Sequence, residues 1–267
     1  MARYFKILSF FFLLVSFCLI LTSCNEIEVV EKEKIGKIVI GCDEYSPYFF
    51  INEDGEFDGI DFSLACEACN RLGYETEFKL IDWTDKDKEL ESGRVDCLWG
   101  AFTIQGLEEK YLWAGPYFES RPVLVVLENS DINTISDLSS KRIGVQVETK
   151  TDDIFSKMEN ENLPKIKELY CFEDMNLAFA ALRKGYVDAV GGHEEVMLYN
   201  INNSIPDYRV LDETLFVSEL GVAFKKDYDK DFVRKLTSVL NDLHDEGFID
   251  EEIKKYNSKG AVTFWYM

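Results

Sequence analysis

The chain has 267 residues, with 29 basic and 50 acidic side chains and a formal net charge of −21. Without residues 1–23, which contain Arg3 and Lys6 but no acid, the charge becomes −23. Such a surface repels phosphate backbones and anionic lipid headgroups, which excludes nucleic-acid binding and attachment to a membrane through a basic patch. The hydrophobic content of 46% is sufficient for a packed core, and the length fits one large domain or two of about 100–120 residues.

The N-terminus has the organisation of a bacterial export signal. Arg3 and Lys6 precede an apolar run of 15 residues, 7–21. Because a membrane-spanning helix needs about 20 residues, this length favours a signal peptide. The following Leu21-Thr22-Ser23-Cys24 resembles a lipobox, in which the cysteine receives the lipid, although Ser23 replaces the usual Gly or Ala. The alternative is an ordinary signal peptide or an uncleaved anchor.

We therefore expect a lipoprotein signal peptide at 1–23, lipidation of Cys24 and a charged tether at 24–35. The mature protein would be anchored in the cell envelope, in the periplasm or on the outer face of the cytoplasmic membrane. No second apolar run of spanning length follows in this sequence.

Seven cysteines are present, of which Cys18 lies in the predicted signal peptide. Five remain after the lipid site: Cys42, Cys66, Cys69, Cys97 and Cys171. An odd number in an exported chain leaves at least one free thiol. The Cys66-x-x-Cys69 pair has no second pair and no nearby histidine, so small core-facing residues are a better interpretation than a metal site. We expect no metal and no cofactor.

Short β-rich segments alternate with amphipathic segments in the first half of the mature chain, as is typical of an α/β fold. Gly73 and Gly93 are expected to end the two helices there. The predicted strands are 37–42, 75–80 and 95–99, with a small hairpin at 49–55; the predicted helices are 62–72 and a second one that runs through Leu90.

The second half repeats this alternation. Its clearest helix is 232–246, which carries Phe232, Leu236, Leu240 and Leu243 on one face and ends at Gly247. The other predicted helices are 135–138, 151–159, 175–184 and 249–256; the predicted strands are 122–127, 142–147, 166–170, 187–190 and 220–224.

A series of short motifs occurs in a specific order along residues 37–256. It comprises Ile38-Val39-Ile40-Gly41, Asp43-Glu44-Tyr45-Ser46-Pro47-Tyr48, Gly55-x-x-x-Gly59-Ile60-Asp61, Arg71-Leu72-Gly73-Tyr74, Asp82-Trp83, Ser92-Gly93-Arg94-Val95-Asp96-Cys97, Ala114-Gly115-Pro116-Tyr117, Asp137-Leu138, Gly144-Val145-Gln146 and Ala181-Leu182-x-x-Gly185-x-Val187-Asp188-Ala189-Val190. Each motif is weak alone, but together they resemble the family 3 extracellular solute-binding proteins, whose best-known members deliver polar amino acids to ABC importers.

This resemblance implies a two-lobed α/β fold of the periplasmic-binding-protein type II, in which each lobe is a mainly parallel sheet flanked by helices. Lobe 1 would comprise 36–120, lobe 2 would comprise 121–216, and 217–260 would return to lobe 1. Two hinge strands would join the lobes, and a small ligand would bind in the cleft as it closes. The expected partner is an ABC permease in the membrane, and the protein is expected to be a monomer.

Candidate ligand contacts follow the first two predicted strands of the first half, where α/β sheets usually bind ligands. Tyr45 follows 37–42 and Trp83 follows 75–80, and the resemblance implies that such aromatics sandwich a ligand side chain. The alternative for each is an ordinary half-buried aromatic. Asp43 and Glu44 could accept hydrogen bonds from a ligand ammonium.

Three elements depart from the family's amino-acid-binding pattern. Leu107 occupies the position of the arginine that grips the ligand carboxylate, His193 that of the aspartate that holds the amino group, and Glu148-Thr149-Lys150 replaces Gly-Thr-Thr. His193 could donate or accept a hydrogen bond and would titrate near the pH of the medium, or it could simply cap a helix.

The segment 100–106 also lacks the usual Thr-x-Thr spacing, although its Thr103 and Gln105 remain candidate ligand contacts. Lys150, Arg121 or backbone N–H groups could replace the missing arginine, but a lysine is a point charge and grips a carboxylate less well. Glu44 and Glu148 near the presumed cleft favour neutral or cationic ligands.

We therefore predict an extracytoplasmic lipoprotein that captures a small polar solute, such as an amino acid or a related compound, and delivers it to an ABC importer. The alternative is a ligand-sensing module that signals to a membrane partner without transport. The sequence contains no recognisable nucleophile–base pair, phosphate loop or metal cluster, so no enzymatic activity is expected.

Overall fold

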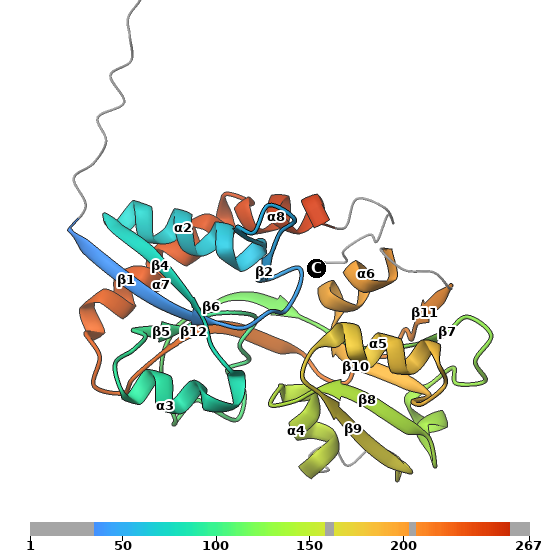
Figure 1. Cartoon of the computed structure of the whole chain (residues 1–267). Helices are drawn as coiled ribbons and strands as arrows, with labels where there is room; N and C mark the ends of the chain where they lie inside the picture. Colours follow the sequence, from blue (N-terminus) through green and yellow to red (C-terminus); the bar gives the residue numbers. More distant parts are fainter. Residues whose placement is uncertain (1–34, 158–162, 203–206, 257–267) are drawn as a thin grey trace, which may run out of the picture. The chain divides into compact units, whose positions relative to one another are not determined.

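The computed structural model describes residues 35–157, 163–202 and 207–256 (Figure 1). By its internal contacts the chain divides into residues 1–33 and 34–267, and every element described below belongs to the second unit. Cys24 and the predicted signal peptide lie outside the described residues.

The first sheet has the strand order β4-β1-β5-β12-β6. β1 lies parallel to β4 and β5, whereas β12 lies antiparallel to β5 and β6. The strands are β1 (Gly36–Cys42), β4 (Tyr74–Leu80), β5 (Cys97–Leu98), β6 (Leu112–Ser120) and β12 (Ser218–Phe224). Their helices are α2 (Ile60–Leu72), α3 (Lys86–Glu91), α7 (Lys230–Asp245) and α8 (Phe248–Tyr256). The C-terminal helices α7 and α8 therefore pack beside α2, far from them in sequence (Figure 1).

The second sheet has the order β11-β7-β10-β8-β9 and also combines two parallel with two antiparallel pairings. Its strands are β7 (Pro122–Leu127), β8 (Arg142–Gln146), β9 (Glu168–Phe172), β10 (Ala189–His193) and β11 (Tyr208–Val210). Its helices are α4 (Lys150–Lys157), α5 (Met175–Arg183) and α6 (Glu194–Asn202). Short elements complete the described chain: β2 (Phe50–Ile51), β3 (Phe57–Asp58), η1 (Trp83–Asp85) and η2 (Ile135–Leu138).

Three elements differ from the sequence expectation. The strand β6 was not predicted because its Gly115-Pro116 pair has the composition of a turn. The helix α6 was missed because its two glutamates, Glu194 and Glu195, are buried together with its apolar residues, so its polar residues do not mark an exposed face. The short strand β11 was also not predicted. The antiparallel strands β6 and β12 explain why the first sheet is only partly parallel.

Glycines fix both ends of α2. Gly59 precedes it with φ of 132°, and a Cβ atom built there would lie 2.2 Å from the backbone oxygen of Tyr48. Only glycine permits that close approach. Gly73 ends the helix in the left-handed conformation, as the sequence predicts. This geometry places the 43–48 loop, which carries candidate ligand contacts, directly against the start of α2.

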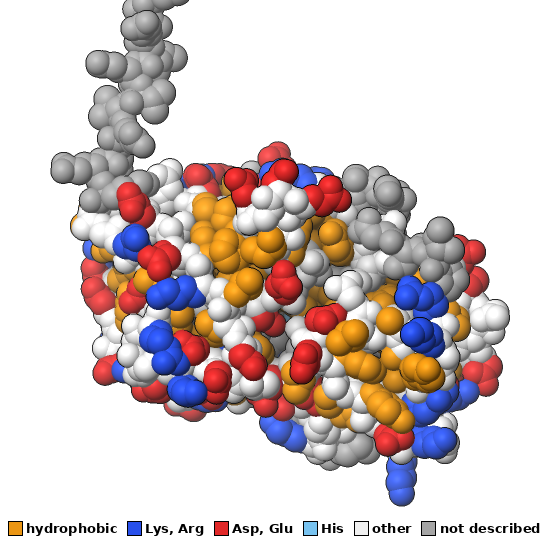
Figure 2. Space-filling view, viewed as in Figure 1, with side chains coloured by type: hydrophobic (Ala, Val, Ile, Leu, Met, Phe, Trp, Pro, Cys, Tyr) orange, Lys and Arg blue, Asp and Glu red, His pale blue; other side chains and the backbone are white. Residues whose placement is uncertain are grey.

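The chain passes between the two sheets twice, from β6 to β7 and from β11 to β12. The largest hydrophobic cluster contains side chains from both sheets, including Ile40 and Phe224 of the first and Val123 and Val190 of the second. Acidic and basic side chains are interspersed over the visible face of the protein (Figure 2). The strand ends that face the space between the sheets are therefore held on a packed core.

Candidate ligand-binding site

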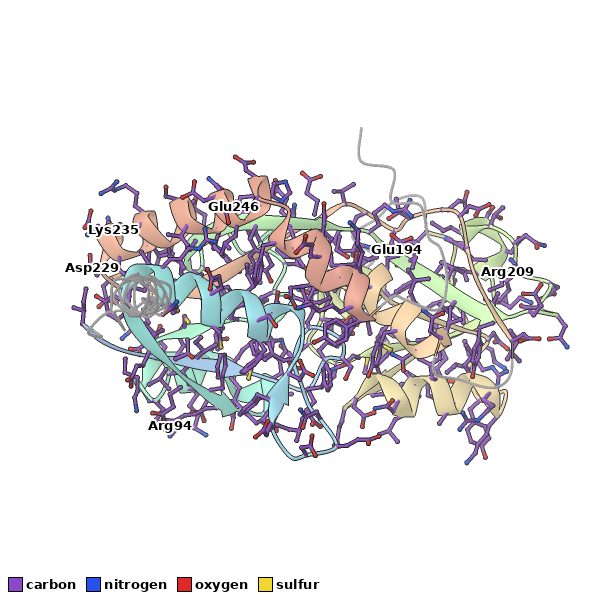
Figure 3. All side chains as sticks on the ribbon, turned by 90° about the horizontal axis from the view of Figure 1, so that it is seen from above. Arg94, Glu194, Arg209, Asp229, Lys235 and Glu246 are labelled. Atoms are coloured by element: carbon purple, nitrogen blue, oxygen red, sulfur yellow. The ribbon has the colours of Figure 1, made fainter. Side chains whose placement is uncertain are left out.

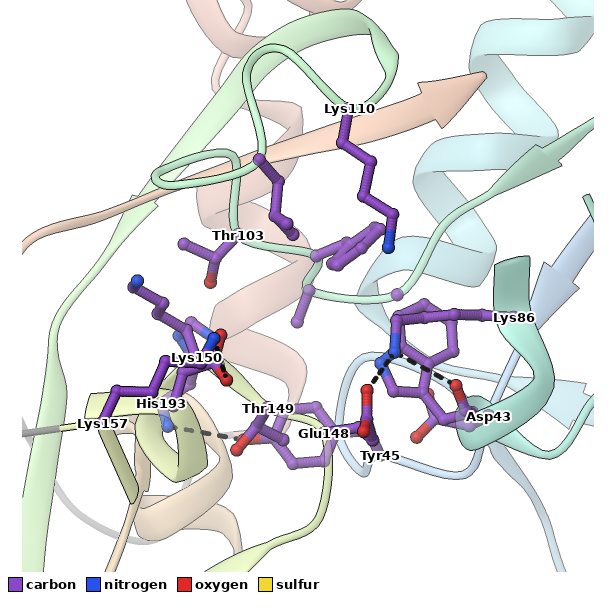
Figure 4. A pocket seen from close by; sticks show the side chains of 16 residues that line it. Asp43, Tyr45, Lys86, Thr103, Lys110, Glu148, Thr149, Lys150, Lys157 and His193 are labelled. Atoms are coloured by element: carbon purple, nitrogen blue, oxygen red, sulfur yellow. Dashed lines mark hydrogen bonds and ion pairs between the residues drawn. The ribbon is translucent and has the colours of Figure 1, made fainter. Parts of the chain in front are cut away.

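A cavity of about 320 Å³ lies where loops from the two sheets meet (Figure 4). Several of its lining residues lie at the ends of strands: Asp43 follows β1, Trp83 follows β4, Glu148 follows β8, and His193 ends β10. Loops beyond strand ends are the usual ligand site in α/β sheets. The lining residues are Asp43, Tyr45, Trp83, Lys86, Gly100, Ala101, Phe102, Thr103, Leu107, Lys110, Glu148, Thr149, Lys150, Asp153, Lys157 and His193.

Aromatic side chains form firm walls of the cavity. The Trp83 and Phe102 rings meet edge to face with centroids 5.0 Å apart, and both residues are buried. The Tyr45 ring stacks on Tyr48 at 6.2 Å with an interplanar angle of 10°. These ring contacts and the burial of both side chains restrict Tyr45 and Trp83, so they can offer apolar contact area to a ligand with little loss of side-chain entropy.

The charged lining differs from what the sequence suggested. Within the described residues, four lysines and three acids face the cavity. Glu44 is exposed and does not line it, whereas Glu148 is paired with Lys86 at 2.7 Å. Burial raises the pKa of Asp43 to about 7, so this carboxyl is only partly charged near neutral pH. The cavity is therefore less acidic than the sequence expectation of neutral or cationic ligands assumed.

Lys150 is the first residue of α4 and reaches across the cavity towards the loop that contains Leu107. A Cβ atom built on Gly106 would lie 3.2 Å from Lys150 Nζ, and Gly106 has φ of +85°. Leu107 lines the cavity at the position where the family resemblance expects arginine. Figure 4 shows Lys150 and Lys157 on one side of the cavity and Lys86 with Glu148 on the other.

The Thr149 and Thr103 hydroxyls line the cavity but already have partners. Thr149 Oγ1 donates to the backbone oxygen of Gln146, the last residue of β8, at 2.8 Å and accepts from the backbone N–H of Asp152 in α4 at 3.2 Å. Thr103 Oγ1 shares a hydrogen bond of 2.8 Å with Ser218 Oγ. Both threonines therefore also fix the loops that carry them.

His193 is buried beside two tyrosines. Its ring lies 6.1 Å from Tyr45 and 6.2 Å from Tyr48, edge-on to both, and its backbone N–H donates to Tyr45 Oη at 3.5 Å. Burial lowers its pKa to about 4, which corrects the expectation that it titrates near the pH of the medium. Its Nδ1 atom has no hydrogen-bond partner in the described part of the chain. His193 thus presents a neutral imidazole.

Two other sequence candidates lie outside the lining. Gln105 exchanges two hydrogen bonds with Glu219, at 2.9 and 3.0 Å. Arg121 forms a two-pronged ion pair with Glu194, at 3.0 and 2.6 Å, and Figure 3 labels Glu194 at the start of α6. Of the two cations considered as replacements for the missing arginine, only Lys150 lines the cavity.

Several lining residues were not predicted from the sequence: Lys86, Phe102, Lys110, Asp153 and Lys157. Two of them carried a usable signal. Lys86 lies three residues after Trp83 in the loop that follows β4, and Lys157 lies seven residues after Lys150, on the same face of α4.

The described residues contain no group of three or more metal-ligating side chains and no helix long and apolar enough to cross a membrane. Within the same ranges no disulfide bond joins any of the five cysteines Cys42, Cys66, Cys69, Cys97 and Cys171. Cys66 and Cys69 lie in α2, where Cys69 is buried.

Residues 38–259 match the family model of the bacterial extracellular solute-binding proteins, family 3. The chain is 28% identical over 220 residues to a glutamine-binding protein of Geobacillus stearothermophilus, covering 80% of this chain and 81% of the relative. It is 25% identical over 214 residues to a probable histidine-binding protein of Campylobacter jejuni, covering 79% and 81%. A solved ABC uptake transporter substrate-binding protein from Streptococcus pneumoniae with bound histidine has a TM-score of 0.74 and 25% identity, covering 85% of this chain and 94% of that chain.

Proposed function

The chain belongs to the bacterial extracellular solute-binding proteins of family 3, and from this premise we propose that it binds an amino acid or a related small polar solute and delivers it to an ABC importer. The observation that carries the proposal is the cavity between the strand ends of the two sheets, lined by Tyr45, Trp83 and Lys150. The aromatics offer apolar contact, and the lysine offers a cation to a ligand carboxylate. The relatives named for glutamine and histidine binding support the same class of ligand.

We infer reversible binding without turnover, which the binding-protein relatives support. We also retain the proposal that lobe 1 comprises 36–120 and 217–260 and that lobe 2 comprises 121–216. Under this proposal the two connections between the sheets serve as the hinge. Attachment of lipid to Cys24, after removal of 1–23, would keep the binding domain at the cell envelope. A sensing role that signals to a membrane partner without transport remains the second hypothesis.

The proposal is tested by thermal-shift screening of the mature chain with amino acids, amines and organic acids, followed by calorimetry on those that stabilise it. We expect at least one amino acid to raise the melting temperature and to be recovered unchanged. Because a charged hydrogen bond contributes about 1.5–3 kcal/mol, Lys150→Ala should weaken its binding about 10- to 100-fold.

The matched control is Lys254→Ala, a change at an exposed lysine on α8. It should leave the affinity unchanged. If no solute in the screen raises the melting temperature, the binding function is contradicted. If Lys150→Ala and Lys254→Ala change the affinity equally, the role of Lys150 is contradicted.

A further inference from the structure

Lys86 and Glu148 join the two halves of the cavity. Lys86 begins α3, which belongs to the first sheet's half, and Glu148 follows β8 of the second sheet. Lys86 Nζ donates to Glu148 Oε2 at 2.7 Å and to the backbone oxygen of Trp83 at 3.2 Å (Figure 4). Both side chains line the cavity, so the ion pair belongs to its wall.

The surroundings make Lys86 dependent on this partner. Its side chain is only 7% exposed, whereas that of Glu148 is 50% exposed. The ammonium also lies 5.5 Å from the centroid of the Trp83 ring. A buried ammonium needs a compensating charge, because removal from water is costly and one aromatic ring does not replace its hydration. The carboxylate of Glu148, from the second sheet's half, supplies this charge by direct contact.

The backbone at Glu148 is adapted to this contact. Glu148 has φ of +59°, in the left-handed region that favours glycine, and its N–H donates to Asp152 Oδ2 at 3.0 Å. A second hydrogen bond also joins the two sheets' halves: Gln146 Nε2 donates to Asp43 Oδ2 at 3.2 Å. A glutamate in an unfavourable conformation, directed at a buried lysine, indicates a role for its side chain rather than for its backbone.

We propose that Glu148 is a specificity-determining residue of the binding site: by pairing with Lys86 of the first sheet's half, it keeps the space beside Trp83 for an uncharged part of the ligand. The inference rests on the proposed function and deepens it. With Glu148 in place, a ligand anion near Trp83 meets a carboxylate and an ammonium that is already paired. Without it, the same anion meets a buried lysine that has lost its directly paired carboxylate.

The ligand test compares L-glutamine with L-glutamate, which have the same shape and differ in side-chain charge. Relative to the unaltered protein, Glu148→Gln should raise the ratio of glutamate affinity to glutamine affinity at least tenfold. Adding Lys86→Met to this variant should return the ratio close to its original value. An unchanged ratio in Glu148→Gln would overturn the proposal.

A second measurement needs no ligand and decides the matter if neither amino acid binds. Iodide is an anion that quenches tryptophan fluorescence, and the part due to Trp83 is obtained by subtracting the signal of matched Trp83→Phe proteins. Glu148→Gln should at least double the iodide quenching of Trp83 and leave quenching by neutral acrylamide unchanged, whereas the double variant should behave as the original protein.

Equal iodide quenching with and without Glu148 would overturn the proposal, even if an amino acid binds. Increased iodide quenching with no amino-acid binding would support the charge role of Glu148 and count against the proposed function alone.

Glu148→Gly, which suits the left-handed backbone, provides a second variant that should fold and should show the same increase. Glu91→Gln, at an exposed glutamate on α3, is the matched control and should change neither quencher's effect.

Discussion

His193 illustrates how burial sets the chemistry of a single side chain. It is 4% exposed, edge-on to two tyrosine rings, and its pKa is lowered to about 4 because the charged form would lose its hydration. A neutral imidazole next to the cavity can accept or donate one hydrogen bond without adding charge. The site therefore keeps this group uncharged at the pH values at which solvent-exposed histidines titrate.

This shift predicts a pH dependence of stability. Between pH 6.5 and 4 the unfolded chain binds a proton at His193 and the folded chain does not, so the contribution of this residue to stability falls as the pH is lowered. The loss should begin near pH 6.5 and reach up to about 3 kcal/mol near pH 4. In urea unfolding at pH 4–8, His193→Gln should lack this contribution. His244→Gln, at the exposed histidine of α7, should keep the pH dependence of the original protein, and identical curves for all three proteins would contradict the assignment.

At the scale of an element, α7 (Lys230–Asp245) shows how sequence periodicity and a capping residue define a helix. Its buried side chains are Phe232, Val233, Leu236, Leu240 and Leu243. The helix begins two residues earlier than its apolar periodicity predicted, because Asp229 caps it. Asp229, which Figure 3 labels, accepts through its Oδ1 from the N–H groups of Asp231 at 2.9 Å and of Phe232 at 3.3 Å.

Removing this cap should weaken the packing of the C-terminal helices on the first sheet. We expect Asp229→Ala to lower the free energy of unfolding by about 1 kcal/mol, measured by urea denaturation. Asp229→Asn keeps an oxygen acceptor at the same position and should stay within a few tenths of a kcal/mol of the original protein. A loss of equal size in both variants would show that charge, rather than capping, is responsible.

At the scale of the whole binding domain, buried polar contacts connect residues that are far apart in the chain. Glu195 Oε2, at the start of α6, accepts hydrogen bonds from Tyr48 Oη at 2.9 Å and from Ser120 Oγ at 2.6 Å. Burial raises the pKa of Glu195, and its two donors partly offset that effect. This cluster lies where the chain passes from β6 to β7, so it fixes the connection between the sheets.

Tyr48→Phe tests the cluster without changing the packed volume greatly. It leaves a buried carboxyl with one fewer donor, which should lower the free energy of unfolding by about 1–2 kcal/mol. Tyr170→Phe is the control, because Tyr170 Oη donates to Glu168 at 2.7 Å at an exposed position, where water can replace it. Urea denaturation should show a clear loss only for Tyr48→Phe; matching curves would mean that the buried hydrogen bond contributes little.

Local patterns predicted most of the fold but only part of the site. Strands such as β1 and helices such as α7 follow from periodicities that neighbouring residues carry. The helix α6 was not predicted because its two glutamates are buried with its apolar residues, so the polar residues do not mark an exposed face. For the site, Tyr45 and Trp83 were found because they follow strands, whereas Lys110 carries no local mark of its position beside the cavity.

By itself, the sequence determined the family resemblance, the alternation of strands and helices, and the loss of arginine at Leu107, since all of these are properties of residue order. Only the tertiary structure decided which charged side chains form ion pairs. Lys86 and Glu148 are 62 positions apart, and Arg121 and Glu194 are 73 apart, yet each pair is in contact. An ion pair depends on spatial distance and desolvation, which no local pattern encodes, so the charge offered to a ligand emerged only from the folded chain.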